Sequence, residues 1–405
     1  MSKRVILHCD CNSFFASVET VLNPEYRDVP MAVCGSVEER HGIVLAKNEQ
    51  AKRYGIQTAE TVYSAKKKCP NLVISKPHHR EYERFSKRVN AIYARYTDII
   101  EPFGIDESWL DVTASGRFFG TGLEIAEKIR QQVKEEIGIT VSIGVSFNKV
   151  FAKLGSDYKK PDAITVISEE NYRDIVYPLP AGALLFVGKK TEQQLNSMGA
   201  RTVGDIVNIG EPLLKRALGK MGETLYKYAA GLDDSPVAPE REEAKSVGSG
   251  FTFNRDLVNL EDCRVGIEYL ADDIAARLRK MGMLCSTVSL SIKDDKLSVI
   301  QRQCPQIPPT DTARLIANTA YDILLKEWNR ETPIRMLTVT AQNLVIANTV
   351  TEQLSLFETE IQEENQKSKI KEEMVDKIRQ KYGAFSILQG SIISSDIGVY
   401  RHKGD

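Results

Sequence analysis

Three acidic residues lie beside short apolar runs that have the length of buried strands. Asp10 ends the run Ile6-Leu7-His8-Cys9, and Asp106 and Glu107 follow a tight turn at Gly104. Three carboxylates close together repel one another unless cations lie between them. Hard oxygen ligands suit Mg²⁺, which also accepts the phosphate oxygens of a substrate. Each acid alone is more simply explained as a helix cap or a surface charge, but together they indicate a metal site for phosphate chemistry.

The elements around these acids explain how they can meet. The hydrophobic periodicity predicts a strand at 4–10, a helix at 81–95, strands at 99–103 and 108–112, a helix near 123–137 and a strand at 139–145. This order of elements is the split βαβ, ferredoxin-like pattern. It implies an antiparallel sheet with helices on one side, in which the strand of Asp10 lies beside the strand that Asp106 and Glu107 begin.

The rest of the chain divides into further segments. Residues 11–78 alternate short strand and helix signals and form an insertion after the first strand. Residues 168–232 have the pattern of short helices broken by glycines, and the proline-bearing stretch 233–244 suits a flexible linker. Residues 245–350 repeat the first order of elements and predict a second ferredoxin-like domain, which a polar tail at 351–405 follows. The predicted fold class is α+β.

Length and composition limit the class of protein. A chain of 405 residues with 42% hydrophobic residues suits two to four domains, and a formal net charge of −1 requires that any nucleic-acid surface be segregated from the acids. The seven cysteines are scattered and predict neither disulfides nor a zinc site; Cys9 and Cys11 should point away from Asp10. Without an apolar segment of about 18 residues or a signal-peptide pattern, we expect a cytoplasmic protein that does not enter a membrane.

Three motifs, in order along the chain, resemble those of one enzyme family. They are Cys9-Asp10-Cys11-Asn12-Ser13-Phe14-Phe15-Ala16-Ser17-Val18-Glu19, then Ile105-Asp106-Glu107-Ser108-Trp109-Leu110-Asp111, then Ser142-Ile143-Gly144-Val145-Ser146 with Asn148-Lys149 and Ala152-Lys153. With these motifs the chain resembles the Y family of translesion DNA polymerases, from about residue 4 to 345. It looks closest to the bacterial polymerase IV type. Because Asn12 and Ala46-Lys47-Asn48 also resemble the polymerase V catalytic subunit, the branch stays open.

The resemblance implies an architecture: a palm at 1–10 and 79–167, fingers at 11–78, a thumb at 168–232 and a little finger at 245–350. It also implies a reaction, the addition of deoxynucleoside triphosphates to a primer 3′-hydroxyl with low fidelity, past damaged bases. Asp10, Asp106 and Glu107 would hold two Mg²⁺ ions, with the backbone carbonyl of Cys11 as a further ligand. Such ions lower the pKa of the attacking hydroxyl and neutralise the leaving pyrophosphate. No histidine would be catalytic, and Asp111 would be structural.

The resemblance further implies residues for the incoming nucleotide. Phe15 would be the steric gate, because an aromatic ring beneath the sugar leaves no room for a 2′-hydroxyl. Phe14 would be a core residue or a wall of the nucleotide pocket. Lys52 and Lys160 would contact the triphosphate, where a cation stabilises charge on the leaving group.

Two positions depart from the family pattern. The family often has threonine and tyrosine where this chain has Ala46 and Glu49. We expect Ser13 or Asn48 to make the triphosphate contacts that these two positions would otherwise supply.

DNA contacts are expected in both halves of the chain. Phe186–Thr191 and Gly199–Ile206 resemble a helix–hairpin–helix, which offers backbone N–H groups to phosphates, with Gly188, Lys189 and Lys190 as its contacts. The alternation in Ser286–Ile292 predicts one polar sheet face in the little finger. Its DNA-facing residues would be Lys293 and Arg335, with Lys245, Arg255 and Arg302, whereas Arg277, Arg279 and Lys280 would be solvent-facing charges on helices.

The tail contains a peptide that resembles a partner motif. Gln353, Leu354, Leu356 and Phe357 are similar to the peptide by which bacterial polymerases dock on the sliding clamp. We expect a monomer that binds primer–template DNA, deoxynucleoside triphosphates and this clamp. A short amphipathic helix at 368–382 either packs back on the chain or meets a partner.

Two other classes of protein share parts of this pattern. A nucleotidyl cyclase has a similar palm, but the hairpin motif and the clamp-like peptide argue against it. A non-catalytic DNA-damage adaptor would typically lack the three acids. A lysine or arginine that permanently filled the acidic pocket would exclude synthesis.

Overall fold

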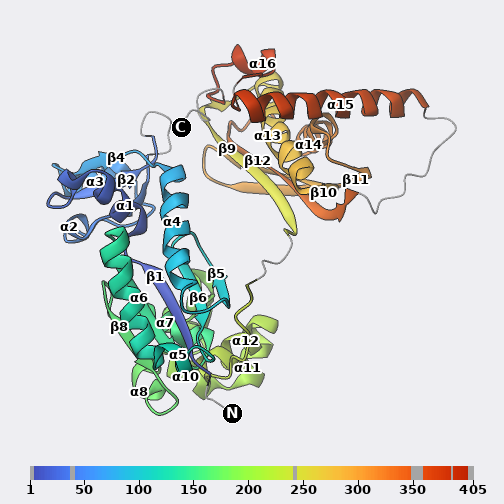
Figure 1. Cartoon of the computed structure of the whole chain (residues 1–405). Helices are drawn as coiled ribbons and strands as arrows, with labels where there is room; N and C mark the ends of the chain where they lie inside the picture. The colour runs from blue at the N-terminus through green and yellow to red at the C-terminus, as the bar shows by residue number, and fades with distance from the viewer. Residues whose placement is uncertain (1–3, 37–41, 240–243, 348–358, 385, 400–405) are drawn as a thin grey trace. The chain divides into compact units, whose positions relative to one another are not determined.

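The computed structural model describes residues 4–36, 42–239, 244–347, 359–384 and 386–399 (Figure 1). The chain divides into two compact units, the first comprising Met1–Gly35 with Ile43–Arg241 and the second the remainder. Each unit has a hydrophobic core of its own, as a chain of this length requires.

A five-stranded sheet forms the centre of the first unit. Its strands are β1 (Ile6–Cys11), β5 (Ile100–Pro102), β6 (Glu107–Asp111), β7 (Val141–Ser146) and β8 (Ile164–Ile167), in the order β5-β6-β1-β7-β8. The strands β5, β6, β1 and β7 pair antiparallel in this spatial order, which is the order of a ferredoxin-like sheet and confirms the prediction. Leu7, Cys9 and Cys11 point into the core, so the alternation of the strand directs Asp10 to the other face.

Helices cover both faces of this sheet. They are α4 (His79–Tyr93), α5 (Gly116–Phe119), α6 (Gly122–Ile137) and α7 (Lys149–Tyr158). The apolar stripes of α4 and α6 pack on the face that carries the two cysteines. The opposite face carries α7, so close that a Cβ at Gly144 would lie 1.8 Å from the carbonyl oxygen of Ala152. The prediction of helices on one side only is wrong because α7 crosses over from β7 to the parallel strand β8, which the hydrophobic pattern did not reveal.

An inserted subdomain follows β1. It contains α1 (Phe14–Leu22), the 3-10 turn η1 (Pro24–Tyr26), β2 (Met31–Cys34), β3 (Val44–Lys47), α2 (Glu49–Lys52), α3 (Val62–Lys68) and β4 (Val73–Ser75). The strands form a small sheet in the order β3-β2-β4 over a separate apolar cluster. Asn48 and Thr61 begin α2 and α3, and each accepts a hydrogen bond from a backbone N–H three residues further on. Such caps fix where the helices start.

Short helices complete the first unit. They are α8 (Tyr172–Val176), the 3-10 turn η2 (Ala181–Ala183), α9 (Lys189–Ser197), α10 (Val203–Ile209), α11 (Glu211–Leu218) and α12 (Lys220–Ala229). They surround an apolar core that includes Leu195, Ile206 and Leu225. Thr202 and Asp205 form a capping box at the start of α10, which fixes the turn between α9 and α10.

The segment 233–239 packs on the first unit. Val237 is buried with Ile6 and Trp109 on the α7 side of the sheet. The backbone N–H of Ala238 donates to Glu101 Oε2 at 2.8 Å. The prediction of a flexible linker is therefore wrong for this part, because one valine in a polar stretch finds an apolar site.

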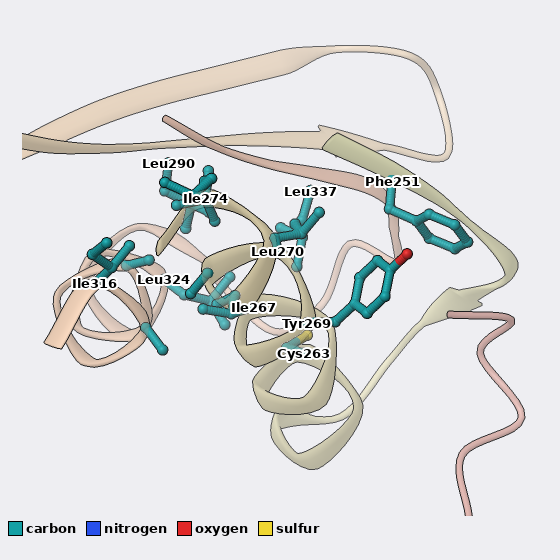
Figure 2. Packing of buried hydrophobic residues seen from close by; sticks show 14 of the residues in the cluster. Phe251, Cys263, Ile267, Tyr269, Leu270, Ile274, Leu290, Ile316, Leu324 and Leu337 are labelled. Carbon is teal, nitrogen blue, oxygen red and sulfur yellow. The ribbon is translucent and has the colours of Figure 1, made fainter. Parts of the chain in front are cut away.

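The second unit is a four-stranded sheet covered by two helices. Its elements are β9 (Ser246–Leu257), α13 (Leu260–Met281), β10 (Met283–Asp294), β11 (Val299–Thr310), α14 (Ala313–Glu327) and β12 (Ile334–Ile346). Figure 2 shows Ile267, Leu270 and Ile274 of α13 facing Leu290 and Leu337 of the sheet. The apolar positions of α13 therefore form the centre of this core.

The strands of the second unit lie in the order β11-β10-β12-β9 and pair antiparallel. The sequence of elements is the predicted one, but a ferredoxin-like sheet would place the first strand in the centre, whereas β9 is at the edge. Both orders bury one apolar face under two helices, so the hydrophobic pattern does not distinguish them.

The chain beyond 358 belongs to the second unit. α15 (Thr359–Tyr382) is held to α13 and to the start of α14 by ion pairs and hydrogen bonds, and α16 (Gly390–Ile393) follows it (Figure 1). Ile392, Ile397 and Val399 are buried in the same core as α13. The prediction of a tail is wrong for these described residues, because the apolar residues near the C-terminus fill the core.

The seven cysteines are free, and all except Cys304 are buried. Burial raises the pKa of Cys9 well above its ordinary value, which makes it a packing residue rather than a reactive thiolate. None of the described helices combines the length and the apolar character that a membrane span needs.

Candidate active site

The predicted acids meet where β1 ends and β6 begins. Asp10 lies opposite Glu107 in the antiparallel pair, and the Cys11 N–H donates to the Asp106 carbonyl at 2.9 Å. The turn before β6 is tight at Gly104, because a Cβ there would lie 3.3 Å from Asp106 Oδ1 and 3.2 Å from Glu107 Cγ, so both acidic side chains would have to shift slightly. The fold therefore brings together residues that lie about a hundred positions apart in the sequence.

Two lysines contact this acidic cluster. Nζ of Lys160 lies 2.7 Å from Asp10 Oδ2, and Nζ of Lys153 lies 2.5 Å from Glu107 Oε2. Lys160 also contacts Asp157 Oδ1 at 2.7 Å. Within the described chain, no lysine or arginine contacts the carboxylate of Asp106. Two ammonium groups thus face three acids, and one negative charge stays unmatched.

The pKa values of the acids reflect this imbalance. Burial, together with the charges of Asp10 and Glu107, raises the pKa of Asp106 to about 6. Burial alone would also raise the pKa of Glu107, but His8 and Lys153 lower it to about 2. Burial opposes the charge of Lys160, yet Asp10 and Asp157 raise its pKa above the ordinary value. Asp106 is therefore the member of the cluster whose charge is least compensated.

His8 belongs to the cluster, although no role was predicted for a histidine. Ser156 donates its hydroxyl to the Lys153 carbonyl at 2.8 Å, so its oxygen accepts from Nδ1–H of His8, also at 2.8 Å. Nε2 then lies 3.3 Å from Glu107 Oε2 without a hydrogen bond. Burial lowers the pKa of His8, which favours the neutral ring. The signal was in the sequence: His8 is two residues before Asp10 in a strand, so both side chains share one face.

This set of donors fits a divalent cation. Nε2 of His8 and the carboxylates of Asp10 and Glu107 offer ligand atoms within 4.8 Å of one another. Asp106 is not in that group, although its charge interacts with both acids. An uncompensated acid and a buried nitrogen without a partner are both features that a cation would relieve, and carboxylate oxygens favour hard ions such as Mg²⁺.

The aromatic residue after the first acid has a well-defined support. The ring of Phe15 stacks on Tyr82, with centroids 4.1 Å apart and planes inclined by 12°. Glu19, fully buried, accepts hydrogen bonds from Tyr82 Oη at 2.6 Å, from His78 Nδ1 at 2.8 Å and from Ser75 Oγ at 3.2 Å. Sequence reasoning missed this support, although Phe15 and Glu19 are four residues apart on one helix face.

Phe14 is buried in the core of the palm-like sheet beside Tyr82. This position matches the first of its two predicted roles, a core residue. A wall of a nucleotide pocket would need an accessible ring face.

Asn48 has no capacity left for a triphosphate. Its Oδ1 accepts from the N–H of Ala51 at 2.9 Å and of Met31 at 3.1 Å, and its Nδ2 donates to the carbonyls of Tyr26 and Val29 at 3.2 and 2.8 Å. An amide makes about four such bonds. The prediction that Asn48 replaces a nucleotide contact is therefore contradicted, because the side chain ties the insertion together.

Ser13, Glu49 and Lys52 lie close to one another in the insertion. Lys52 Nζ lies 2.6 Å from Glu49 Oε1, and the Ser13 hydroxyl is 3.5 Å from the same oxygen. Ser13 and Glu49 line a cavity of about 310 Å³ that also includes Asn12 and Thr140. Ser13 adopts a positive φ of 49° at the start of α1, which turns the chain between β1 and the helix.

The predicted DNA contacts separate into two groups. Gly188, Lys189 and Lys190 are exposed at the start of α9. On β10, Lys293 shares the polar face with Ser289 and Ser291, which confirms the predicted alternation.

Arg335 lies at a register shift of β12, between Ile334 and Met336, and pairs with Asp256 at 3.3 Å. Arg302 likewise pairs with Glu327 at 3.1 Å. The prediction that Arg302 faces DNA is contradicted, because it lies opposite the core residue Leu290, on the helix side of the sheet, and has an acidic partner there. A DNA contact of Arg335 stays a prediction.

Two more predicted roles are corrected, and one group cannot be placed. Arg255 contacts Asp396 and Asp262, at 2.6 and 2.8 Å, and so holds the C-terminal segment. Arg279 is not a solvent-facing charge: its side chain is 8% exposed, and it pairs with acids of α15. The residues of the clamp-like peptide, Gln353, Leu354, Leu356 and Phe357, lie outside the described residues.

The fold and the acids together define a class of protein. A ferredoxin-like sheet with acids on adjacent strands, an inserted small sheet, a group of short helices and a separate βαββαβ unit is the architecture of Y-family DNA polymerases. Family models agree: residues 9–157 match the impB/mucB/samB family, 184–233 match the DNA polymerase-iota thumb domain, and 244–356 match the impB/mucB/samB C-terminal domain. The chain belongs to the impB/mucB/samB family within the Y-family DNA polymerases.

Individual relatives cover almost the whole chain. DNA polymerase IV of Acetivibrio thermocellus is 49% identical over 401 residues, 98% of this chain and 100% of the relative. DNA polymerase IV 1 of Bacillus subtilis is 35% identical over 394 residues, 97% of this chain and 94% of the relative. A solved Y-family polymerase chimera of Dbh and Dpo4 has a TM-score of 0.75 at 24% identity, covers 84% of this chain and 99% of its own, and supports the fold. Y-family polymerases are metal-dependent, as the donor set requires.

Proposed function

We propose that the chain is a template-directed DNA polymerase of the type that its relatives are named for, which adds deoxynucleotides to a primer 3′-hydroxyl and copies past damaged bases with low fidelity. The observation that carries the proposal is the unmatched negative charge at the junction of β1 and β6. Family membership gives the class of enzyme, and this cluster gives its reaction, phosphoryl transfer.

Asp10, Asp106, Glu107 and the backbone carbonyl of Cys11 would hold two Mg²⁺ ions. When bound, such ions lower the pKa of the attacking hydroxyl and neutralise charge on the leaving pyrophosphate. Nε2 of His8, which Ser156 orients through Nδ1, lies 3.3 Å from Glu107 Oε2 and would offer a further ligand atom to a cation. The polymerase reaction therefore depends on an acid set that lysines alone do not neutralise.

Lys160 would contact one partner before the nucleotide binds and another afterwards. Without a nucleotide it pairs with Asp10 at 2.7 Å. We expect the triphosphate to take Lys160 away from Asp10, which frees the carboxylate for a metal ion and places an ammonium group on the leaving group. Its side chain is 31% exposed, so this movement does not require unfolding. The lysine is thus an exchangeable counter-ion rather than a permanent one.

The nucleotide and DNA sites surround this cluster. Phe15 serves as the gate against ribonucleotides, because Tyr82 fixes the position of its ring. Lys52 and Ser13 contact the triphosphate after Glu49 releases Lys52. The exposed start of α9, with Lys189 and Lys190, holds a DNA phosphate.

The remaining proposals concern partners. The peptide that contains Gln353 and Phe357 docks on a bacterial sliding clamp, and the enzyme acts as a cytoplasmic monomer on primer–template DNA. Tethering to a clamp raises the effective concentration of polymerase at a primer end. Identities of 49% and 35% to relatives named DNA polymerase IV support that branch.

Primer extension tests the proposed reaction. The protein is incubated with a labelled primer on undamaged and lesion-bearing templates, with Mg²⁺ or with a chelator. We expect extension on both templates in Mg²⁺ and none in the chelator. A cyclic nucleotide product, or DNA binding without extension under every condition, would refute the proposal.

Lys160→Ala tests the exchange of partners. Loss of this ammonium group should raise the KM for the nucleotide by about 10–100-fold, more than it lowers binding of DNA, because the contact is to the triphosphate. Lys159→Ala is the matched control, since Lys159 is an exposed neighbour outside the cluster. Equal KM values for the two variants would remove Lys160 from the nucleotide site.

A further inference from the structure

The C-terminal helix α15 packs on the second unit through a side that carries acidic residues and an arginine. Glu372 pairs with Arg279 at 2.5 Å and accepts the N–H of Ala313 at the start of α14. Asp376 also pairs with Arg279, at 2.6 Å, and Arg379 pairs with Asp272 at 2.8 Å. An ordinary surface helix turns its apolar stripe toward the domain. Here ion pairs hold the helix instead, and they fix its rotation about its own axis.

The outward side of α15 is apolar. Ile370, Met374, Ile378 and Tyr382 are 49, 59, 37 and 67% exposed. They recur every four residues, so they form one continuous stripe along the helix. Because the opposite side is occupied by the ion pairs, this stripe cannot turn inward without breaking them.

Lysines lie on the same outward side. At about 100° per residue, Lys371, Lys377 and Lys381 project within the arc of the stripe, and all three are exposed. Nζ of Lys381 lies 5.0 Å from the ring centroid of Tyr382. Glu373 is exposed at the margin of this arc. The face therefore combines four apolar anchors with an excess of positive charge.

The helix is held in place beyond its own contacts. Ile392, Ile397 and Val399, which follow it, are buried in the domain core. Arg255 holds Asp396, and the Asn254 N–H donates to the Ile397 carbonyl at 3.1 Å. The stripe is therefore carried by a helix that is fixed at its C-terminal end, which reduces the entropy lost when a partner binds.

We propose that this outward face of α15 is a docking site for an acidic partner protein, which offers an apolar groove rimmed by carboxylates. Anchors at every fourth position of a helix are the pattern of helix-in-groove recognition. The three lysines complement an acidic rim, which steers the encounter and selects the partner.

Other occupants fit the face less well. A second copy of the chain would bring lysines against lysines. DNA would neutralise the lysines, but its phosphate backbone would offer no apolar surface to cover the four apolar side chains. A spacing of four residues advances about 40° per step around the helix, so the stripe turns by about 120° from Ile370 to Tyr382 and does not lie in one plane. A flat anionic membrane contacts a straight stripe, whereas a groove can follow a turning one.

The probe is a phage-displayed library of small helical-bundle domains with a randomised groove, selected on the full-length protein. We expect the selected domains to carry an apolar groove that is rimmed by carboxylates. Their affinity should fall at least tenfold in the double variant Met374→Asp and Ile378→Asp, and also between 50 and 300 mM salt. Ile307→Asp is the matched control, since Ile307 is an exposed apolar residue elsewhere in the unit. The melting temperature and primer extension of the double variant should match the wild type, because its substituted side chains are exposed.

Three results would overturn the proposal. One is selection of domains without an acidic groove, or of domains whose binding the double variant does not alter. Another is binding of phosphatidylglycerol vesicles or duplex DNA that the double variant abolishes while binding of groove-bearing domains is absent. The third is a concentration-dependent dimer in sedimentation that the double variant converts to a monomer. Each of these assigns the face to a different occupant.

Discussion

The acidic cluster of the palm-like sheet and the ionic contacts beneath α15 use the same chemistry in opposite ways. Beneath α15, Arg279 contacts two acids and the Asp311 carbonyl, and Glu372 caps the start of α14. In the palm-like sheet, two lysines face three acids, and Asp106 has no cationic partner among the described residues. In the first set each acid contacts an arginine, whereas in the second the carboxylate of Asp106 contacts no cation of the described chain.

The difference separates architecture from activity. Paired buried charges fix the orientation of an element, and removing one partner is strongly destabilising. An acid whose pKa is raised by neighbouring acids lowers the stability of the metal-free fold. Such a residue is kept in the sequence because of the ligand that it binds. Substitutions in the two sets should therefore have opposite effects on stability and activity.

Asp106→Asn gives the largest expected effect. Losing a metal ligand should reduce primer extension by more than about 1,000-fold, beyond the 10–100-fold typical of residues that only support a ligand. The fold should be kept or become more stable, because the repulsion with Asp10 and Glu107 is relieved. Single-turnover extension and thermal unfolding of the metal-free protein measure both quantities.

Asp111→Asn is the control for this variant, since Asp111 lies at the other end of β6 and caps its own loop through the Thr113 N–H. It should retain extension. Retained extension in Asp106→Asn, or unfolding of that variant, would reverse the contrast between the two regions.

Arg279→Met tests the paired set. The variant leaves Glu372 and Asp376 without their main cation, which should lower the free energy of unfolding of the second unit by about 3–5 kcal/mol. Hydrogen exchange along α15 and chemical denaturation measure the change. Arg277→Met on the same helix is the matched control, because Arg277 is half-exposed and its contact to Asp273 is 3.6 Å; it should cost less than about 1 kcal/mol. Equal losses would mean that the inner contacts do not hold α15.

The pH dependence of stability should differ between wild type and Asp106→Asn. The folded pKa of Asp106, about 6, lies above its ordinary 3.8, so the folded protein binds this proton more tightly than the unfolded chain. The charged carboxylate of Asp106 lowers the free energy of unfolding by its full amount above pH 6, and this loss of stability disappears as pH falls toward 3.8. A shift of this size corresponds to about 3 kcal/mol. Glu107 acts in the opposite direction but at lower pH, between its ordinary 4.5 and about 2.

Denaturation in a chelator from pH 8 to pH 4 measures this prediction. Asp106→Asn should be the more stable protein at pH 8, and the difference should vanish near pH 4. Saturating Mg²⁺ should reduce the difference at pH 8, because the ion stabilises the wild-type acid. A constant difference at all pH values would show that Asp106 is not under repulsion.

The part of the fold that could be predicted is the part that hydrophobic periodicity encodes. The periodicity of β1, α4, β6, α6 and β7 gave the sheet that places Asp10 opposite Glu107. The spatial order of β9 to β12 could not be obtained in this way, because both orders bury the same apolar residues. Three apolar residues near the C-terminus were too few to predict that they complete a core.

The candidate site shows the same limit. The acids were predicted because acids beside apolar strands are rare, but Lys153, His8 and Glu19 were not. Their partners lie 46, 148 and 63 residues away in the sequence, at Glu107, Ser156 and Tyr82 respectively. Asn48 was assigned to the nucleotide because the sequence does not show that four backbone groups already use its amide.

The smallest expected effect tests the support of Phe15. Tyr82→Phe keeps the ring that stacks on Phe15 but removes the donor to Glu19, at a cost of about 1–2 kcal/mol. A less firmly held ring should raise ribonucleotide incorporation a few-fold, whereas Phe15→Ala should raise it far more. The ratio of kcat/KM for deoxynucleotides and ribonucleotides measures both.

Tyr93→Phe on the same helix is the matched control for that variant. Its hydroxyl is also buried but faces the thiols of Cys9 and Cys11 instead of Glu19, so its removal should leave sugar discrimination unchanged. If Tyr82→Phe behaved like Tyr93→Phe, the hydrogen bonds to Glu19 would only stabilise the junction of α1 and α4. If it relaxed discrimination without loss of stability, the hydroxyl would act on the ring of Phe15 alone. If Glu19 positions the gate residue Phe15 through Tyr82, then Tyr82→Phe should lose stability and relax sugar discrimination together.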